Sequence, residues 1–88
     1  MTRKECLEKA IGCVCQDREN DYGSPEDSFD AIAKLWAAYL DRPISSHDVG
    51  MMMALMKVAR LKSGRFKEDS YIDAAGYIAC ASEIGTEK

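Results

Sequence analysis

The chain has few of the features that mark membrane-spanning, secreted or duplex-binding proteins. No apolar run approaches the roughly 18 residues that a membrane span requires. The first ten residues, MTRKECLEKA, are charged and lack the apolar core of a signal peptide. These absences predict a cytoplasmic protein with no membrane partner.

The sequence also has no excess of basic residues. Lys and Arg total 12 against 15 Asp and Glu, which gives a net charge of −3. A protein that binds duplex nucleic acid normally presents a basic face, whereas here the cations are interspersed with acids. We therefore expect no duplex nucleic acid partner, although a few converging cations can still hold a small phosphorylated ligand.

The four cysteines and the one histidine are not spaced as a metal site. Cys13 and Cys15 form no C-x-x-C motif, and on a helix their thiols diverge by about 200°. Zinc would need two more ligands, and the only histidine, His47, lies on another element. His47 also has no nucleophile placed beside it by sequence. We expect reduced structural thiols, a solvated His47, and no bound metal or cofactor.

Four helices are predicted, because apolar residues recur at helical spacing and no segment alternates as a strand does. The first covers residues 3–17. The second begins at the cap Ser24 and the first-turn residue Pro25, and ends before Arg42 and Pro43. The third begins at Ser45, which with Asp48 three residues later forms a start like a capping box, and Gly64 after its end can adopt a left-handed cap. The fourth covers residues 68–84. The 88 residues are expected to form one all-α domain, a small four-helix bundle, with a frayed tail from about residue 85.

The third and fourth predicted helices carry the apolar faces from which we predict helix packing and oligomer formation. The segment VGMMMALMKVARL is apolar nearly all round, since Met51, Met52 and Met53 point in directions about 100° apart. A helix of this kind is buried on most sides, so we expect a homo-oligomer. On the fourth helix the expected packing side consists of Tyr71, Ile72, Ala75, Ile78 and Ala79.

Charged residues at regular spacing on the same two helices are the first candidate site. Lys57 and Arg60 interrupt an apolar helix, and unpaired buried charge is costly. They should reach solvent or pair with acids such as Asp69 and Asp73, which share a helix face with Tyr77. Three interpretations stay open: a structural ion-pair network, a polar pocket for an anionic ligand, and a magnesium site that uses both carboxylates.

The segment RENDYGSPEDSF, residues 18–29, is the second candidate. Ser24 and Pro25 are explained as the start of a helix. Arg18, Asp21 and Tyr22 precede that helix, whose N-terminus favours anions. Arg18 is suited to holding a phosphate and Tyr22 to stacking on a base, while the plainer interpretation is a turn with a cap.

Three segments together resemble a family of small phage and prophage proteins. They are DYGSPEDSFDAIAKLWAAYL, HDVGMMMALMKVARL and EDSYIDAAGYIACASEI, and the resemblance covers residues 18–84. The family is classed as a domain of unknown function, and its members are often labelled MazG-like nucleotide pyrophosphohydrolases. The family pattern includes the following residues of this chain: Arg18, Asp21, Tyr22, Gly23, Pro25, Asp48, Lys57, Arg60, Asp69, Asp73 and Tyr77.

The MazG-like label implies an enzyme that holds magnesium with E-x-x-E on one helix and E-x-x-D on a later one. Here Glu5-x-x-Glu8 fits the first half in form only, outside the block of resemblance. The second half is Asp69-x-x-x-Asp73, with a different spacing and a shorter acid. The loss of one or two carboxylates would weaken a magnesium site badly.

The preferred expectation is therefore a phage-type oligomer that binds a small nucleotide or nucleotide-derived ligand in the host cytoplasm. It would sequester a host immune nucleotide signal without turning it over. The alternative is a magnesium-dependent nucleoside triphosphate pyrophosphohydrolase. The ligand-binding residues expected are Arg18, Asp21, Tyr22, Lys57, Arg60, Asp73 and Tyr77, supported by Asp48 and Asp69; in the enzyme, Asp69 and Asp73 would hold Mg²⁺.

Overall fold

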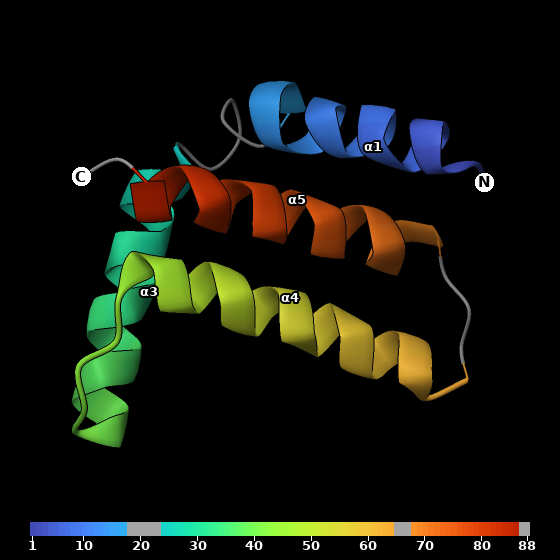
Figure 1. The fold of residues 1–88 in the computed structure, drawn as a ribbon. Helices are drawn as coiled ribbons and strands as arrows, with labels where there is room; N and C mark the ends of the chain where they lie inside the picture. The colour runs from blue at the N-terminus through green and yellow to red at the C-terminus, as the bar shows by residue number, and fades with distance from the viewer. Residues whose placement is uncertain (18–23, 65–67, 87–88) are drawn as a thin grey trace.

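The computed structural model describes residues 1–17, 24–64 and 68–86, and the elements in these ranges are all helical, as predicted (Figure 1). The elements are α1 (Arg3–Gly12), a π-helical turn η1 (Cys13–Asp17), α3 (Pro25–Leu40), α4 (Ser46–Lys62) and α5 (Glu68–Thr86). No strand occurs within these ranges. The all-α prediction is therefore confirmed, and in the described residues no helix is long and apolar enough to cross a membrane.

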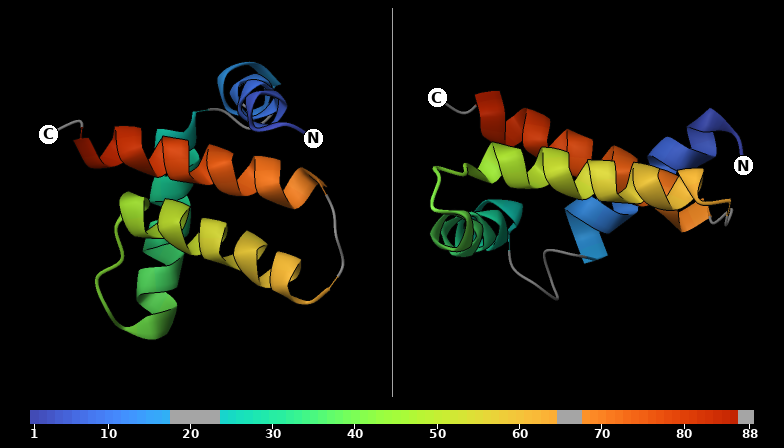
Figure 2. Two further views of the ribbon diagram at one scale, coloured as in Figure 1. Left: turned by 45° about the vertical axis from the view of Figure 1, so that its right-hand side comes forward. Right: turned by 90° about the horizontal axis from the view of Figure 1, so that it is seen from below.

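Helices α4 and α5 form the central pair and lie antiparallel, side by side, in every view (Figures 1 and 2). They approach each other closely at Gly50, where an added Cβ would stand 2.9 Å from the Cβ of Ala81. Val49 is fully buried at the same level. The small side chains thus let the two helices come close enough to exclude water from the core between them.

Helix α3 crosses the end of this pair at a steep angle (Figure 1). Ser24 caps it by accepting a hydrogen bond from the Asp27 N–H at 3.2 Å, and Pro25 occupies its first turn, as predicted. Phe29 and Ala33 bury their side chains in the core. The last turn extends beyond α4 and α5, so Tyr39 is 88% exposed (Figure 1).

Helix α1 lies across α5, with its start on one side of α5 and η1 on the other (Figure 2). Thr2 and Glu5 form a capping box at its start. The predicted single helix over residues 3–17 is continuous but changes to π-helical hydrogen bonding at Cys13. Val14 reaches the core beside Gly76, where an added Cβ would meet the Val14 Cγ1 at 2.9 Å.

The buried face of α5 differs from the predicted one. Tyr71 and Ile78 are each 44% exposed, and Ala79 is also exposed. Of the five residues expected to pack inward, only Ile72 is fully buried. The buried residues are instead Ser70, Ile72, Gly76, Tyr77, Cys80 and Ala81. The reason is that the α4–α5 contact is set by the smallest residues, Gly50 and Ala81, which turn the Ile78 side outward.

Two further details refine the predicted helix ends. Helix α5 continues to Thr86, two residues beyond the expected end, and the Thr86 hydroxyl donates to the carbonyl oxygens of Ser82 and Glu83. Gly64 adopts a φ of 87° just after α4, which confirms its predicted left-handed conformation.

Candidate functional site

An ion pair joins α4 to α5 and is the best-defined polar contact in the core region. The Lys57 Nζ lies 3.0 Å from the Asp73 Oδ2, and the two side chains are only 13% and 28% exposed. Lys57 interrupts an otherwise apolar helix, so its charge needs a partner once the helix packs. Of the two outcomes expected for Lys57, exposure to solvent or pairing with an acid such as Asp69 or Asp73, the structure shows pairing with Asp73.

Asp73 also belongs to the wall of an open hollow between α1, η1 and α5. The hollow has a volume of about 590 Å³. Its lining residues are Lys9, Gly12, Cys13, Asp69, Ile72 and Asp73. We refer to this space as the polar hollow. Asp69 and Asp73 line it together because residues four apart on a helix share a face, as their spacing predicts.

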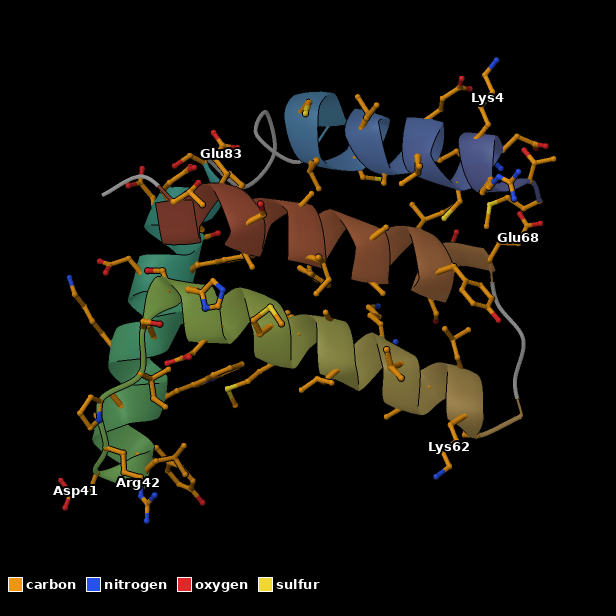
Figure 3. All side chains as sticks on the ribbon, in the orientation of Figure 1. Lys4, Asp41, Arg42, Lys62, Glu68 and Glu83 are labelled. Atoms are coloured by element: carbon orange, nitrogen blue, oxygen red, sulfur yellow. The ribbon has the colours of Figure 1, made fainter. Side chains whose placement is uncertain are left out.

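The cation at the polar hollow comes from α1. The Lys9 Nζ lies 3.8 Å from the Glu68 Oε2, and both side chains are about half exposed (53% and 46%). The N-terminal ammonium also lies 3.9 Å from the Glu68 Oε1. Figure 3 shows Glu68 at this end of α5, whereas Lys4 and Lys62 point away from the helices. An exposed ion pair of this kind is weak, because water and salt compete for both charges. The Lys9 ammonium is therefore available to an anion.

Three other predicted site residues lie elsewhere. Tyr77 is 5% exposed, and its ring centroid lies 6.3 Å from that of Phe29 in the core. Arg60 is exposed in the last turn of α4. Asp48 belongs to the cap of α4. None of the three lines the polar hollow.

Asp48 has a structural role at the start of α4, where it pairs with Ser45. Its Oδ2 accepts a hydrogen bond from the Ser45 N–H at 3.0 Å, and the Ser45 Oγ accepts one from the Asp48 N–H at 3.0 Å. This is the capping box predicted at the start of the helix. The backbone N–H of Ser45, then its hydroxyl, and to a smaller extent His47, lower the pKa of the Asp48 carboxyl.

Arg18, Asp21 and Tyr22 lie outside the described residues. Their expected roles in holding phosphate and stacking on a base stay predictions.

Sequence reasoning missed three residues of the polar hollow: Lys9, Gly12 and Cys13. Cys13 is expected from the sequence only to be a reduced structural thiol. It is half-buried and forms no disulfide. The only local signal was Gly12, a weak helix former at the point where the α-helix changes to the π turn.

The described residues contain no group of three His, Cys, Asp or Glu side chains arranged to hold a metal ion. Asp69 and Asp73 alone supply two carboxylates, and one oxygen of Asp73 already faces Lys57. Glu5 and Glu8 are engaged elsewhere. Glu5 accepts a hydrogen bond from the Thr2 N–H at 3.3 Å, and the Glu8 Oε1 lies 3.9 Å from the Lys4 Nζ. The donor set therefore does not fit a magnesium centre built from these four acids.

The class that these features define is a small all-helical protein with an ion-paired core and a polar hollow beside its central helix. The chain belongs to the family described as Domain of unknown function (DUF6378), whose model matches residues 5–85. The predicted resemblance to a family of unknown function is thereby confirmed.

Two curated relatives come from phages, as the resemblance predicts. The Gene 55 protein of Mycobacterium phage D29 is 41% identical over 81 residues, which cover 92% of this chain and 54% of that protein. The Gene 55 protein of Mycobacterium phage L5 is 38% identical over 61 residues, which cover 68% and 39% respectively. The chain spans about half the length, or less, of the curated relatives it matches. No solved structure matches it.

Proposed function

We propose that this chain is a phage protein that binds a nucleotide or nucleotide-derived ligand in the polar hollow and sequesters it without turnover. The observation that carries the proposal is the meeting of Asp69, Asp73 and Lys9 around one space of about 590 Å³. Small-molecule sites usually have volumes of about 300–1,000 Å³. A nucleotide is of suitable size and carries both kinds of group that these side chains recognise.

The chemistry of the polar hollow divides between its two walls. Ionised carboxylates accept hydrogen bonds, so Asp69 and Asp73 are suited to the hydroxyls of a ribose. The Lys9 ammonium donates to a phosphate and can leave its exposed partner Glu68 to do so. Lys57 holds the Asp73 carboxylate in place through the 3.0 Å ion pair. Arg18 and Tyr22 remain our candidates for a second phosphate contact and for stacking.

A ligand of this kind fits a role in countering host defence. Family membership and the two phage relatives support a phage setting. A small protein that sequesters a host nucleotide signal has no need of a metal or a nucleophile. The engagement of Glu5 and Glu8 outside the polar hollow weighs against the MazG-like pyrophosphohydrolase alternative.

A thermal-shift screen tests the proposal directly. The probes are ADP-ribose, cyclic nucleotides and nucleoside triphosphates, each with and without Mg²⁺. A ligand at 100 times its Kd adds about 2.7 kcal/mol, which raises the Tm of a domain this small by about 10–20 °C. We expect at least one probe to do so, and we expect it to be recovered chemically intact after heat denaturation of the complex.

Matched variants show whether the polar hollow is the site. Asp69→Asn and Lys9→Met remove a hollow-lining charge and should weaken binding by about tenfold or more. Asp30→Asn is the control, because Asp30 is an exposed acid on α3 that pairs with Lys34. Equal binding by all three variants would show that the ligand binds outside the polar hollow. Steady release of pyrophosphate from a triphosphate would contradict sequestration and support the pyrophosphohydrolase alternative.

A further inference from the structure

A second concave surface, apolar rather than polar, lies on a different face of α5. It has a volume of about 570 Å³ and runs between α4 and α5, with α1 contributing at one edge. Its lining residues are Leu7, Met51, Ala54, Leu55, Val58, Ala74, Ala75, Ile78, Ala79 and Ser82. We refer to it as the apolar groove. Among the described residues, it shares no lining residue with the polar hollow.

The large side chains of the apolar groove are exposed to a degree unusual for core-type residues. Leu55 is 64% exposed, Leu7 is 59% exposed and Val58 is 51% exposed. They lie together rather than singly, and contiguous apolar patches on soluble proteins mark interaction sites. The groove also includes Ala75, Ile78 and Ala79, whose spacing had predicted a packing side.

The whole molecule exposes more surface to solvent than is expected for a folded monomer of its mass. A folded 9.8 kDa chain is expected to expose about 5,200 Å², whereas this one exposes 6375 Å². The excess, about 1,200 Å², exceeds the roughly 800 Å² that each partner buries in a standard protein–protein interface. The radius of gyration, 13.4 Å, is likewise above the value of about 12 Å expected for 88 residues.

We propose that the apolar groove is the interface through which two copies of this chain associate about a two-fold axis. In such an interface the same surface meets itself, so it must not oppose like charges. The apolar groove satisfies this condition, because none of its described lining residues is charged although the chain carries a net charge of −3. Ala74, Ala75 and Ala79 allow the helices of the two copies to approach closely, and Met51 can adapt its shape to the partner.

The apolar groove and the polar hollow share no lining residue among the described ones, so this proposal does not rest on the proposed ligand. A dimer also accounts for part of the hydrophobicity of α4, since Met51, Leu55 and Val58 are apolar residues of α4 that line the apolar groove.

Analytical ultracentrifugation of the chain tests the interface. At about 100 µM the protein should sediment as a dimer, because an interface of this size gives a Kd in the micromolar range or below. Leu55→Lys should raise the dimer Kd by more than about tenfold. Leu35→Lys is the matched control: Leu35 is 70% exposed on α3, outside the apolar groove, and its replacement should leave the dimer intact.

A second variant distinguishes loss of the interface from a folding defect. Ala79 is exposed in the protomer, so Ala79→Lys should keep the helical circular dichroism of the parent while its longer side chain separates the two copies. A wild-type chain that stays monomeric at about 100 µM overturns the proposal. Dissociation by Leu35→Lys, with the dimer retained in Leu55→Lys and Ala79→Lys, overturns it as well, because it would move the interface to α3.

Discussion

At the scale of single residues, the surroundings of two helical glycines are opposite. A Cβ added at Gly50 would stand 2.9 Å from the Ala81 Cβ and 3.3 Å from the Ala81 Cα. A Cβ added at Gly12 would meet nothing within 4 Å. Both positions gain helix propensity when Gly becomes Ala, so the difference between them isolates the cost of crowding.

Gly50→Ala should therefore destabilise the protein by up to about 2 kcal/mol. Overpacking costs about 1–3 kcal/mol, and the gain in helix propensity offsets up to about 1 kcal/mol of it. Gly12→Ala should stabilise by up to about 1 kcal/mol. Urea unfolding of both variants measures the two effects. A Gly50→Ala protein as stable as Gly12→Ala would show that α4 and α5 are further apart than the structure has them.

The Lys57–Asp73 ion pair should contribute more than the equally short pair on α3. Removing one partner of a largely buried pair leaves a charge without its counterion. We expect Lys57→Met and Asp73→Asn to couple by about 1–3 kcal/mol in a double-mutant cycle.

The control cycle uses Lys34 and Asp30, whose atoms lie 2.9 Å apart but whose side chains are 78% and 55% exposed. Solvent screening should make that coupling much smaller. Equal coupling in the two cycles would mean that burial adds nothing to the Lys57–Asp73 contact.

At the scale of elements, short-range capping fixes where the helices begin. Ser24 and Pro25 start α3, and the reciprocal hydrogen bonds of Ser45 and Asp48 start α4. Each cap involves residues no more than three apart in the sequence. For this reason the helix starts could be predicted without knowledge of the tertiary contacts.

The cap of α4 predicts a pH dependence with a definite sign. Hydrogen bonds from Ser45 lower the folded-state pKa of Asp48 below its ordinary value of 3.8. The stabilisation is therefore fully present above pH 3.8 and is lost as the pH falls through the lower folded-state pKa. The stability difference between the parent and Asp48→Asn should shrink over that acidic range.

Urea unfolding at a series of pH values measures this difference. Ser45→Ala serves as a control, because it removes the hydroxyl acceptor and should cost about 1 kcal/mol at neutral pH. A difference between the parent and Asp48→Asn that stays constant below pH 3.8 would contradict the assigned role of the carboxylate.

At the scale of the whole molecule, α4 and α5 hold the fold and α1 lies on its surface. Val49, Gly50 and Ala54 are buried on α4, and six residues are buried on α5. Helix α1 buries only Ala10. Since the polar hollow lies between α1, η1 and α5, one of its walls belongs to the least buried helix of the described residues.

Hydrogen exchange should follow this order. Amides at residues 49–54 and 76–81 should exchange at the rate of global unfolding, because their helices share the core. Amides of α1 should exchange at least about tenfold faster through local opening. Native-state exchange read by mass spectrometry tests the difference. Protection of α1 equal to that of α5 would show that the two helices unfold as one unit.

Much of the fold could be predicted from the sequence. The helical class, the starts of α3 and α4, the left-handed Gly64 and the pairing of Lys57 with Asp73 all follow from local chemistry or from the cost of an unpaired buried charge. The polar hollow could be predicted only in part. Asp69 and Asp73 share a face by their spacing, but nothing near them in sequence indicates Lys9, Gly12 or Cys13.

What the sequence alone determined is where helices form and which charges need partners, because those properties depend on neighbours within a turn or two. Only the tertiary structure decided which face of α5 is buried. Its Ile78 side and its Tyr77 side are both apolar enough to pack, and the close contact of Gly50 with Ala81 selects the second. That choice exposes the apolar groove, while the passage of α1 across α5 brings Lys9 and Cys13 to Asp69 and Asp73.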